Sequence, residues 1–142
     1  MGNPHNLGAI QRSAAPLGVR GIFLINPKAS WETGAFYRVA EGGAEAVPVI
    51  PIESVEELVE LSKELGLKVY ATSGHQGSDL YKTKLPNKAV FLIGSEGPGL
   101  SQVAMRNAGG LLRIPGTGLV ESLNVSTAAS VLMGEWFRQH TP

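Results

Sequence analysis

The sequence contains no cysteine among its 142 residues. Disulfide bonds and metal sites built from thiolates are therefore excluded. The three histidines, His5, His75 and His140, are scattered and lack the spacing of a metal-binding set. We therefore expect no metal.

Long apolar runs are also missing. No stretch reaches the roughly eighteen apolar residues that cross a bilayer, and the N-terminus lacks the pattern of a signal peptide. We expect a soluble, cytoplasmic protein with no membrane partner. The length is that of one domain, residues 1–142, which can bury roughly two thirds of its unfolded surface.

The sequence has no excess of either charge, because twelve basic residues balance twelve acidic ones. The distribution of charge therefore matters more than its sum. A predominantly acidic helix is expected within residues 53–64, and we expect it to face away from any anionic partner. The basic residues that we single out are Arg12, Arg20, Lys28, Arg38, Arg106 and Arg113.

Apolar strands and amphipathic helices alternate along the chain. Ser54 and Glu57 can form a capping box, and Gly66 is expected to end the helix that follows Ser54. The alternation predicts an α/β fold, a mostly parallel sheet with helices on both faces. The expected helices are 7–17, 33–41, 55–65, a short one after Ser101, and 124–138; the expected strands are 19–25, 47–52, 67–72, 89–93 and 111–114, with a polar loop at 73–87.

An apolar strand at 89–93 runs into a turn with Gly94, Gly97 and Gly99 around one carboxylate, Glu96. Ligands of parallel sheets bind at such carboxyl ends, and glycines permit close backbone approach. The spacing matches neither the dinucleotide fingerprint nor a nucleotide phosphate loop, which disfavours a common NAD or ATP site. Taken alone, Glu96 is better explained as a cap for the helix that Ser101 begins.

A second glycine-rich loop follows the strand at 111–114, and its polar residues Ser122, Asn124 and Ser126 precede an alanine-rich helix. A helix that starts over such a loop presents unpaired N–H groups to a polar or anionic ligand, although a plain helix cap is the alternative. Near the N-terminus, residues 3–15 join a turn to a helix carrying Arg12. The planar guanidinium suits phosphate, whereas His5 has no visible partner and is interpreted as a loop residue.

Segments 3–15, 91–101 and 114–129, in this order, resemble the three sequence motifs of the SpoU (TrmH-like) family of RNA ribose 2′-O-methyltransferases, in the SPOUT superfamily. The resemblance covers nearly the whole chain, and includes Glu135 and Arg138–Gln139 after the third motif and the stretch 38–45. Each motif alone is a weak signal. Their joint occurrence is specific.

The resemblance implies transfer of a methyl group from S-adenosyl-L-methionine to a ribose 2′-hydroxyl of structured RNA, rRNA or tRNA. Arg12 matches the motif-one arginine and Asn6 its partner, Glu96 matches the motif-two glutamate, and Ser122 and Asn124 match the motif-three polar pair. By position, the cofactor is expected against Gly94, Ile114, Leu123, Gly97 and Gly99, with Thr72 as an edge contact.

Relatives in this family tie the last part of the fold into a deep trefoil knot and dimerise, commonly through the last helix, so we expect both features here. Leu132, Met133, Trp136 and Phe137 make that helix apolar, although burial in its own core explains each side chain equally well. Relatives also have a strand before motif one and many have an N-terminal RNA-binding domain. Neither precedes Asn3 here, so we expect an excised or truncated catalytic domain that chooses its RNA poorly. The weak basic surface indicates that RNA specificity depends on a second subunit or another segment.

Two alternatives stay open. One is a non-catalytic RNA-binding or cofactor-sensing module that keeps the knotted fold, which the complete set of five polar residues argues against. The other is a dinucleotide-dependent oxidoreductase, which the glycine spacing disfavours.

Overall fold

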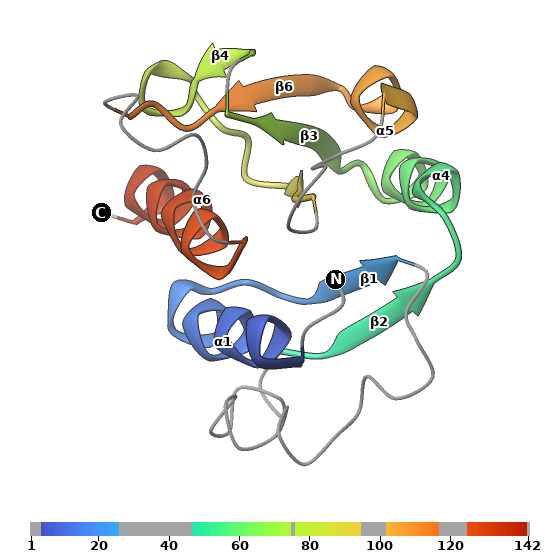
Figure 1. Cartoon of the computed structure of the whole chain (residues 1–142), viewed down its shortest axis with the longest axis horizontal. Helices are drawn as coiled ribbons and strands as arrows, with labels where there is room; N and C mark the ends of the chain where they lie inside the picture. Colours follow the sequence, from blue (N-terminus) through green and yellow to red (C-terminus); the bar gives the residue numbers. More distant parts are fainter. Residues whose placement is uncertain (1–3, 26–46, 75, 95–101, 117–124, 142) are drawn as a thin grey trace. The chain divides into compact units, whose positions relative to one another are not determined.

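The computed structural model describes residues 4–25, 47–74, 76–94, 102–116 and 125–141, without the side chains of 4–6 and 102–103 (Figure 1). The chain divides into two compact units, Met1–Ser54 and Val55–Pro142. No helix in the described part of the chain is long and apolar enough to span a bilayer.

The first unit pairs one helix with two parallel strands. Helix α1 (Pro4–Ala14) continues as the 3-10 turn η1 (Ala15–Leu17), and strand β1 (Ile22–Ile25) pairs in parallel with β2 (Val49–Ile52). The buried side chains of Leu7 on α1 and Leu24 on β1 form its apolar cluster. The helix is thus fixed on the strand pair by burial of apolar surface.

The second unit contains a four-stranded parallel sheet in the order β4-β6-β3-β5. Because all four strands are parallel, their carboxyl ends lie at one edge of the sheet. The strands are β3 (Lys68–Ser73), β4 (Ser78–Asp79), β5 (Ala89–Leu92) and β6 (Gly110–Arg113); the helices are α4 (Val55–Leu65), α5 (Gln102–Asn107) and α6 (Val125–His140), with a 3-10 turn η2 (Leu80–Lys82).

The core of this unit joins the sheet, η2 and α6. Its buried members are Tyr70, Leu80, Leu85, Leu112 and Leu132, of which Leu80, Leu112 and Leu132 are 0% exposed. Helix α6 therefore packs as an integral part of the unit.

The α/β prediction with parallel strands is confirmed, and the helix predicted at 55–65 coincides with α4. Gly66 has φ +71°, its N–H reaches the Lys63 carbonyl at 3.3 Å, and the Leu67 N–H reaches the Ser62 carbonyl at 2.8 Å. This pair of bonds is a Schellman cap, so the predicted helix stop is confirmed too.

Several predicted bounds were wrong, among them the helix expected from residue 7, which begins at Pro4, and the strand expected from residue 47, which begins at Val49. The strand expected from residue 19 begins at Ile22, because Gly18 (φ +75°) and Val19 are bonded back to Ala15 and Ala14 as the cap of η1. The expected loop at 73–87 contains β4 and η2. The helix expected at 33–41 lies outside the described residues.

Gly77 explains how so short a strand as β4 forms. Its φ is +104°, and a Cβ on it would lie 2.5 Å from the Leu111 carbonyl oxygen. Only glycine allows this approach of the chain to β6.

Candidate functional site

The carboxyl edge of the four-stranded sheet gathers three of the predicted cofactor residues. Thr72 lies near the end of β3, Gly94 follows β5, and Ile114 follows β6. The register pairs Ala71 with Leu92, and Thr72 with Leu112, so the three strands end at the same level. The structure thus brings Thr72, Gly94 and Ile114 to one edge.

A side-chain bond fixes that edge. The Thr72 hydroxyl donates to the Leu92 carbonyl at 2.8 Å, which ties the ends of β3 and β5 together. The hydroxyl therefore supports the edge through the strand backbone. Beyond Ile114, a Cβ on Gly116 would meet no atom of the described residues within 4 Å.

Several predicted site residues lie outside the described part of the chain. For Asn6 the structure describes the backbone, in α1, but not the side chain. The others, which lie outside the described residues altogether, are Glu96, Gly97, Gly99, Ser122, Leu123 and Asn124, together with His75.

Arg12 lies on α1 of the first unit with an exposed side chain. Its neighbour Gln11 is 1% exposed and donates from Nε2 to the Val47 carbonyl at 2.6 Å. Adjacent helical residues point about 100° apart, so burial of Gln11 directs Arg12 away from the core. The cationic group is held on a fixed helix face.

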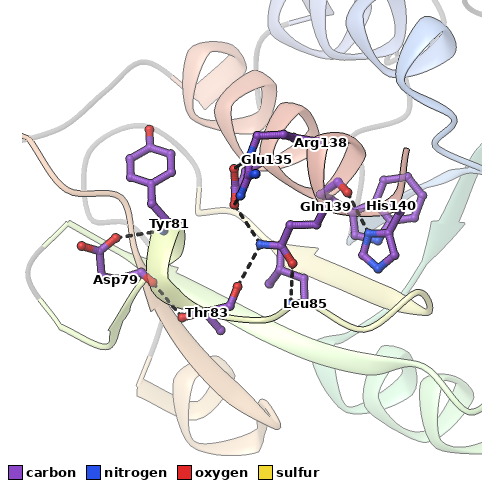
Figure 2. Close-up of polar contacts among 9 residues, drawn as sticks. Asp79, Tyr81, Thr83, Leu85, Glu135, Arg138, Gln139 and His140 are labelled. Atoms are coloured by element: carbon purple, nitrogen blue, oxygen red, sulfur yellow. Dashed lines mark hydrogen bonds and ion pairs between the residues drawn. The ribbon is translucent and has the colours of Figure 1, made fainter. Parts of the chain in front are cut away.

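Sequence reasoning missed a polar network at the end of α6 (Figure 2). The Gln139 amide donates from Nε2 to the Thr83 carbonyl at 2.9 Å, and its Oε1 accepts from the Leu85 N–H at 2.8 Å. The Gln139 side chain thus pairs with a backbone carbonyl and a backbone N–H of the segment 83–85, as the backbone of a neighbouring strand would. The polar residues 135, 138 and 139 on an otherwise apolar helix are the signal that could have indicated it.

Glu135 is the buried anion of this network. Arg138 donates to its two carboxylate oxygens at 2.7 and 2.8 Å, and Gln139 donates to Oε2 at 2.8 Å. Hydrogen bonding from Arg138, with a further bond from Gln139 and the charge of Arg138, outweighs desolvation and lowers the pKa of Glu135 from 4.5 to about 2. The carboxylate therefore stays ionised and holds both partners in place.

Trp136 adds a second anchor next to it. Its Nε1 donates to the Pro86 carbonyl at 3.2 Å, and its ring stacks on His140 with centroids 4.8 Å apart. Because the third motif segment, 114–129, runs into the first turns of α6, these contacts fix the helix that contains its end. Among the described side chains, no group of three or more His, Asp or Glu could hold a metal ion.

Comparison with known proteins gives consistent matches over the whole chain. The family model described as the SpoU rRNA Methylase family matches residues 1–134. A tRNA/rRNA methyltransferase of Escherichia coli O157:H7 named YfiF, itself uncharacterized, is 43% identical over 97% of this chain and 40% of its own length. The 23S rRNA (guanosine-2′-O-)-methyltransferase RlmB of Pseudomonas aeruginosa is 34% identical over 99% of this chain and 56% of its length.

Among solved structures, the AdoMet-bound rRNA methyltransferase of Sinorhizobium meliloti superposes with a TM-score of 0.89 at 29% identity. The superposition covers 99% of this chain and 54% of the S. meliloti chain. The chain therefore spans about half the length of the proteins that it matches.

Proposed function

The chain belongs to the SpoU rRNA methylase family, and from that premise we propose that it is a methyltransferase that uses S-adenosyl-L-methionine to methylate a ribose 2′-hydroxyl in structured RNA, rRNA or tRNA. The names of the E. coli and P. aeruginosa relatives support the RNA substrate, and the AdoMet-bound S. meliloti structure supports the cofactor. The observation that carries the proposal is the shared edge of Thr72, Gly94 and Ile114.

The residues at this edge fit a nucleoside-containing cofactor. Gly94 has no side chain just beyond β5, and no atom of the described residues lies within 4 Å of the Cβ position of Gly116 beyond β6. Parallel sheets bind ligands outside such carboxyl ends. We propose that backbone groups near Gly94, Ile114 and Leu123 hold the cofactor, with Gly97 and Gly99 allowing close approach and Thr72 keeping the edge in register.

When bound, the cofactor supplies a methyl group on a sulfonium sulfur. The attacking ribose hydroxyl has a pKa far above neutrality, so the protein must align it and stabilise negative charge as its proton leaves. A guanidinium is a poor base, so we propose that Arg12 stabilises the developing alkoxide while the proton passes to phosphate or water. The other residues that we propose for the methyl-transfer reaction are Asn6, Glu96, Ser122 and Asn124.

Assembly and location belong to the same proposal. We propose one catalytic domain, 1–142, with the C-terminal trefoil knot of its family, acting in the cytoplasm as a homodimer joined through α6. Leu132 and Met133 are buried, whereas Phe137 is 37% exposed. Phe137 is therefore the exposed apolar residue of this helix that we propose for the interface.

The proposal is tested by transfer of a labelled methyl group from S-adenosyl-L-methionine to bulk rRNA and tRNA. We expect labelled positions that resist alkaline cleavage, because methylation removes the 2′-hydroxyl that attacks the backbone. Arg12→Ala should lower the rate about 100-fold or more and leave affinity for S-adenosylhomocysteine nearly unchanged, with Lys63→Ala on α4 as the control.

Equal rates for Arg12→Ala and the parent would refute the role of Arg12. Cofactor binding with no methylation of either RNA pool would refute the enzyme and favour the non-catalytic module. Label found on bases would refute the ribose as acceptor.

A further inference from the structure

We propose that Tyr81, Lys82 and Lys84, together with Arg138 at the end of α6, form a docking surface for the phosphate backbone of RNA. We call these four residues the basic surface. The inference rests on the proposed function and deepens it, because it says which part of an electrically neutral chain holds the substrate.

The backbone around Thr83 turns two lysines outward. Thr83 is extended, with φ −104° and ψ 129°, its hydroxyl donates to the Asp79 carbonyl at 2.7 Å, and its carbonyl accepts from Gln139. Neighbours of an extended residue point to the opposite side. Lys82 and Lys84 therefore project away from the body of the unit, and both are exposed.

The carboxylates described near this segment, Asp79 and Glu135, accept hydrogen bonds from the protein. Asp79 is half-buried and accepts from the Tyr81 N–H at 2.9 Å, while the Glu135 side chain is 5% exposed. Arg138, which pairs with Glu135, has a side chain that is 68% exposed. The cationic side chains of this region are therefore more exposed to solvent than its carboxylates.

Charge is segregated along the second unit. Helix α4 carries four glutamates and one lysine, whereas residues 76–94 carry three lysines and one aspartate. The formal charge of zero for the whole chain therefore combines an acidic helix with a basic segment. A polyanion can bind the basic segment in spite of the neutral total.

The chemistry favours RNA over an acidic protein surface. The lysines of this segment have no carboxylate between them in the sequence. Such a run of positive charge suits the regularly spaced negative charges of a phosphate backbone. Tyr81 lies beside Lys82 with 52% of its surface exposed, and an exposed aromatic ring can stack on an unpaired base. The Gln139 bonds to Thr83 and Leu85 fix this segment before RNA arrives, so little ordering is required on binding (Figure 2).

The test compares two variants of equal charge. Lys82→Gln/Lys84→Gln removes two cations from the basic surface, and Lys63→Gln/Lys68→Gln removes two exposed cations from α4 and the start of β3. Affinity for fluorescein-labelled bulk tRNA is measured over a series of salt concentrations, and S-adenosylhomocysteine binding is measured for each protein.

For the first variant we expect the slope of log affinity against log salt to fall by about 1.4 to 1.8, which corresponds to about 25-fold or more in affinity at about 0.1 M salt. The control should keep the slope of the parent. The inference would be overturned if both variants lost tRNA affinity equally or if neither lost any. It would also be overturned if the first variant changed the oligomeric state and left tRNA affinity unchanged. Failure of the parent to bind S-adenosylhomocysteine would instead overturn the proposed function, whatever the tRNA result.

Discussion

Replacing Gln139 should destabilise the second unit far more than its position near the end of a helix suggests. Gln139→Leu removes the bonds to the Thr83 carbonyl and the Leu85 N–H, and one of the donors to Glu135. A buried polar group left without a partner costs about 1–3 kcal/mol. Leu85 is 2% exposed, so its N–H bears the full cost, whereas water can reach part of the half-buried Thr83. We expect a loss of about 2–4 kcal/mol in the free energy of unfolding.

Urea unfolding followed by tryptophan fluorescence and circular dichroism measures this loss. The midpoint should fall with an unchanged m-value, because the surface exposed on unfolding stays the same. Gln76→Leu is the matched control, since the Gln76 side chain is exposed, and it should stay within about 0.5 kcal/mol of the parent.

Gln139→Glu adds a pH dependence with a definite sign. In the parent, the pKa of Glu135 is lowered to about 2, so its stabilisation is present above the unfolded value of about 4.5 and is lost as the pH falls toward 2. In the variant, a second carboxylate replaces the Nε2 donor beside Glu135, and repulsion raises both pKa values. The deficit relative to the parent should therefore shrink between about pH 7 and about pH 4.

A Gln139→Leu protein as stable as the Gln76→Leu control would refute the reasoning about the polar network. A Gln139→Glu deficit that is constant or widens on acidification would refute the assignment of Glu135 as the ionised centre.

Two further variants test the sheet. Gly77→Ala should cost at least about 2 kcal/mol in urea unfolding, because φ is positive and the new Cβ meets the Leu111 carbonyl, whereas Gly116→Ala should cost less than about 0.5 kcal/mol; equal stability of the two would contradict the close approach. Thr72→Val loses the bond to the Leu92 carbonyl, so we expect about 1 kcal/mol less stability and, by calorimetry, weaker S-adenosylhomocysteine binding; unchanged affinity would remove this edge from the cofactor site.

Local signals explain which parts of the fold could be predicted from the sequence. Gly66 ends α4 with bonds that involve its nearest neighbours, so both bounds of α4 could be predicted. The two residues of β4 carry no periodic pattern, because their pairing depends on Gly77 and on register with β6. Such non-local pairing is not encoded in a short window of sequence.

The candidate site divides in the same way. Thr72, Gly94 and Ile114 could be placed at one edge, because each lies at or just beyond the end of a parallel strand. The partners of Gln139 lie 54 and 56 residues away in the sequence, so its role could not be predicted before the packing of α6 was known. Roles for Glu96, Ser122 and Asn124 stay predictions.

The most direct test of the central claim is a calorimetric titration of the purified chain with S-adenosylhomocysteine. Leu123→Arg places a charged side chain in the proposed cofactor site, and Leu65→Arg, at a position 53% exposed on α4, is the matched control. We expect saturable binding by the parent and by Leu65→Arg, and none by Leu123→Arg. A folded parent that does not bind, or a Leu123→Arg protein that binds as well as the parent, would contradict this expectation.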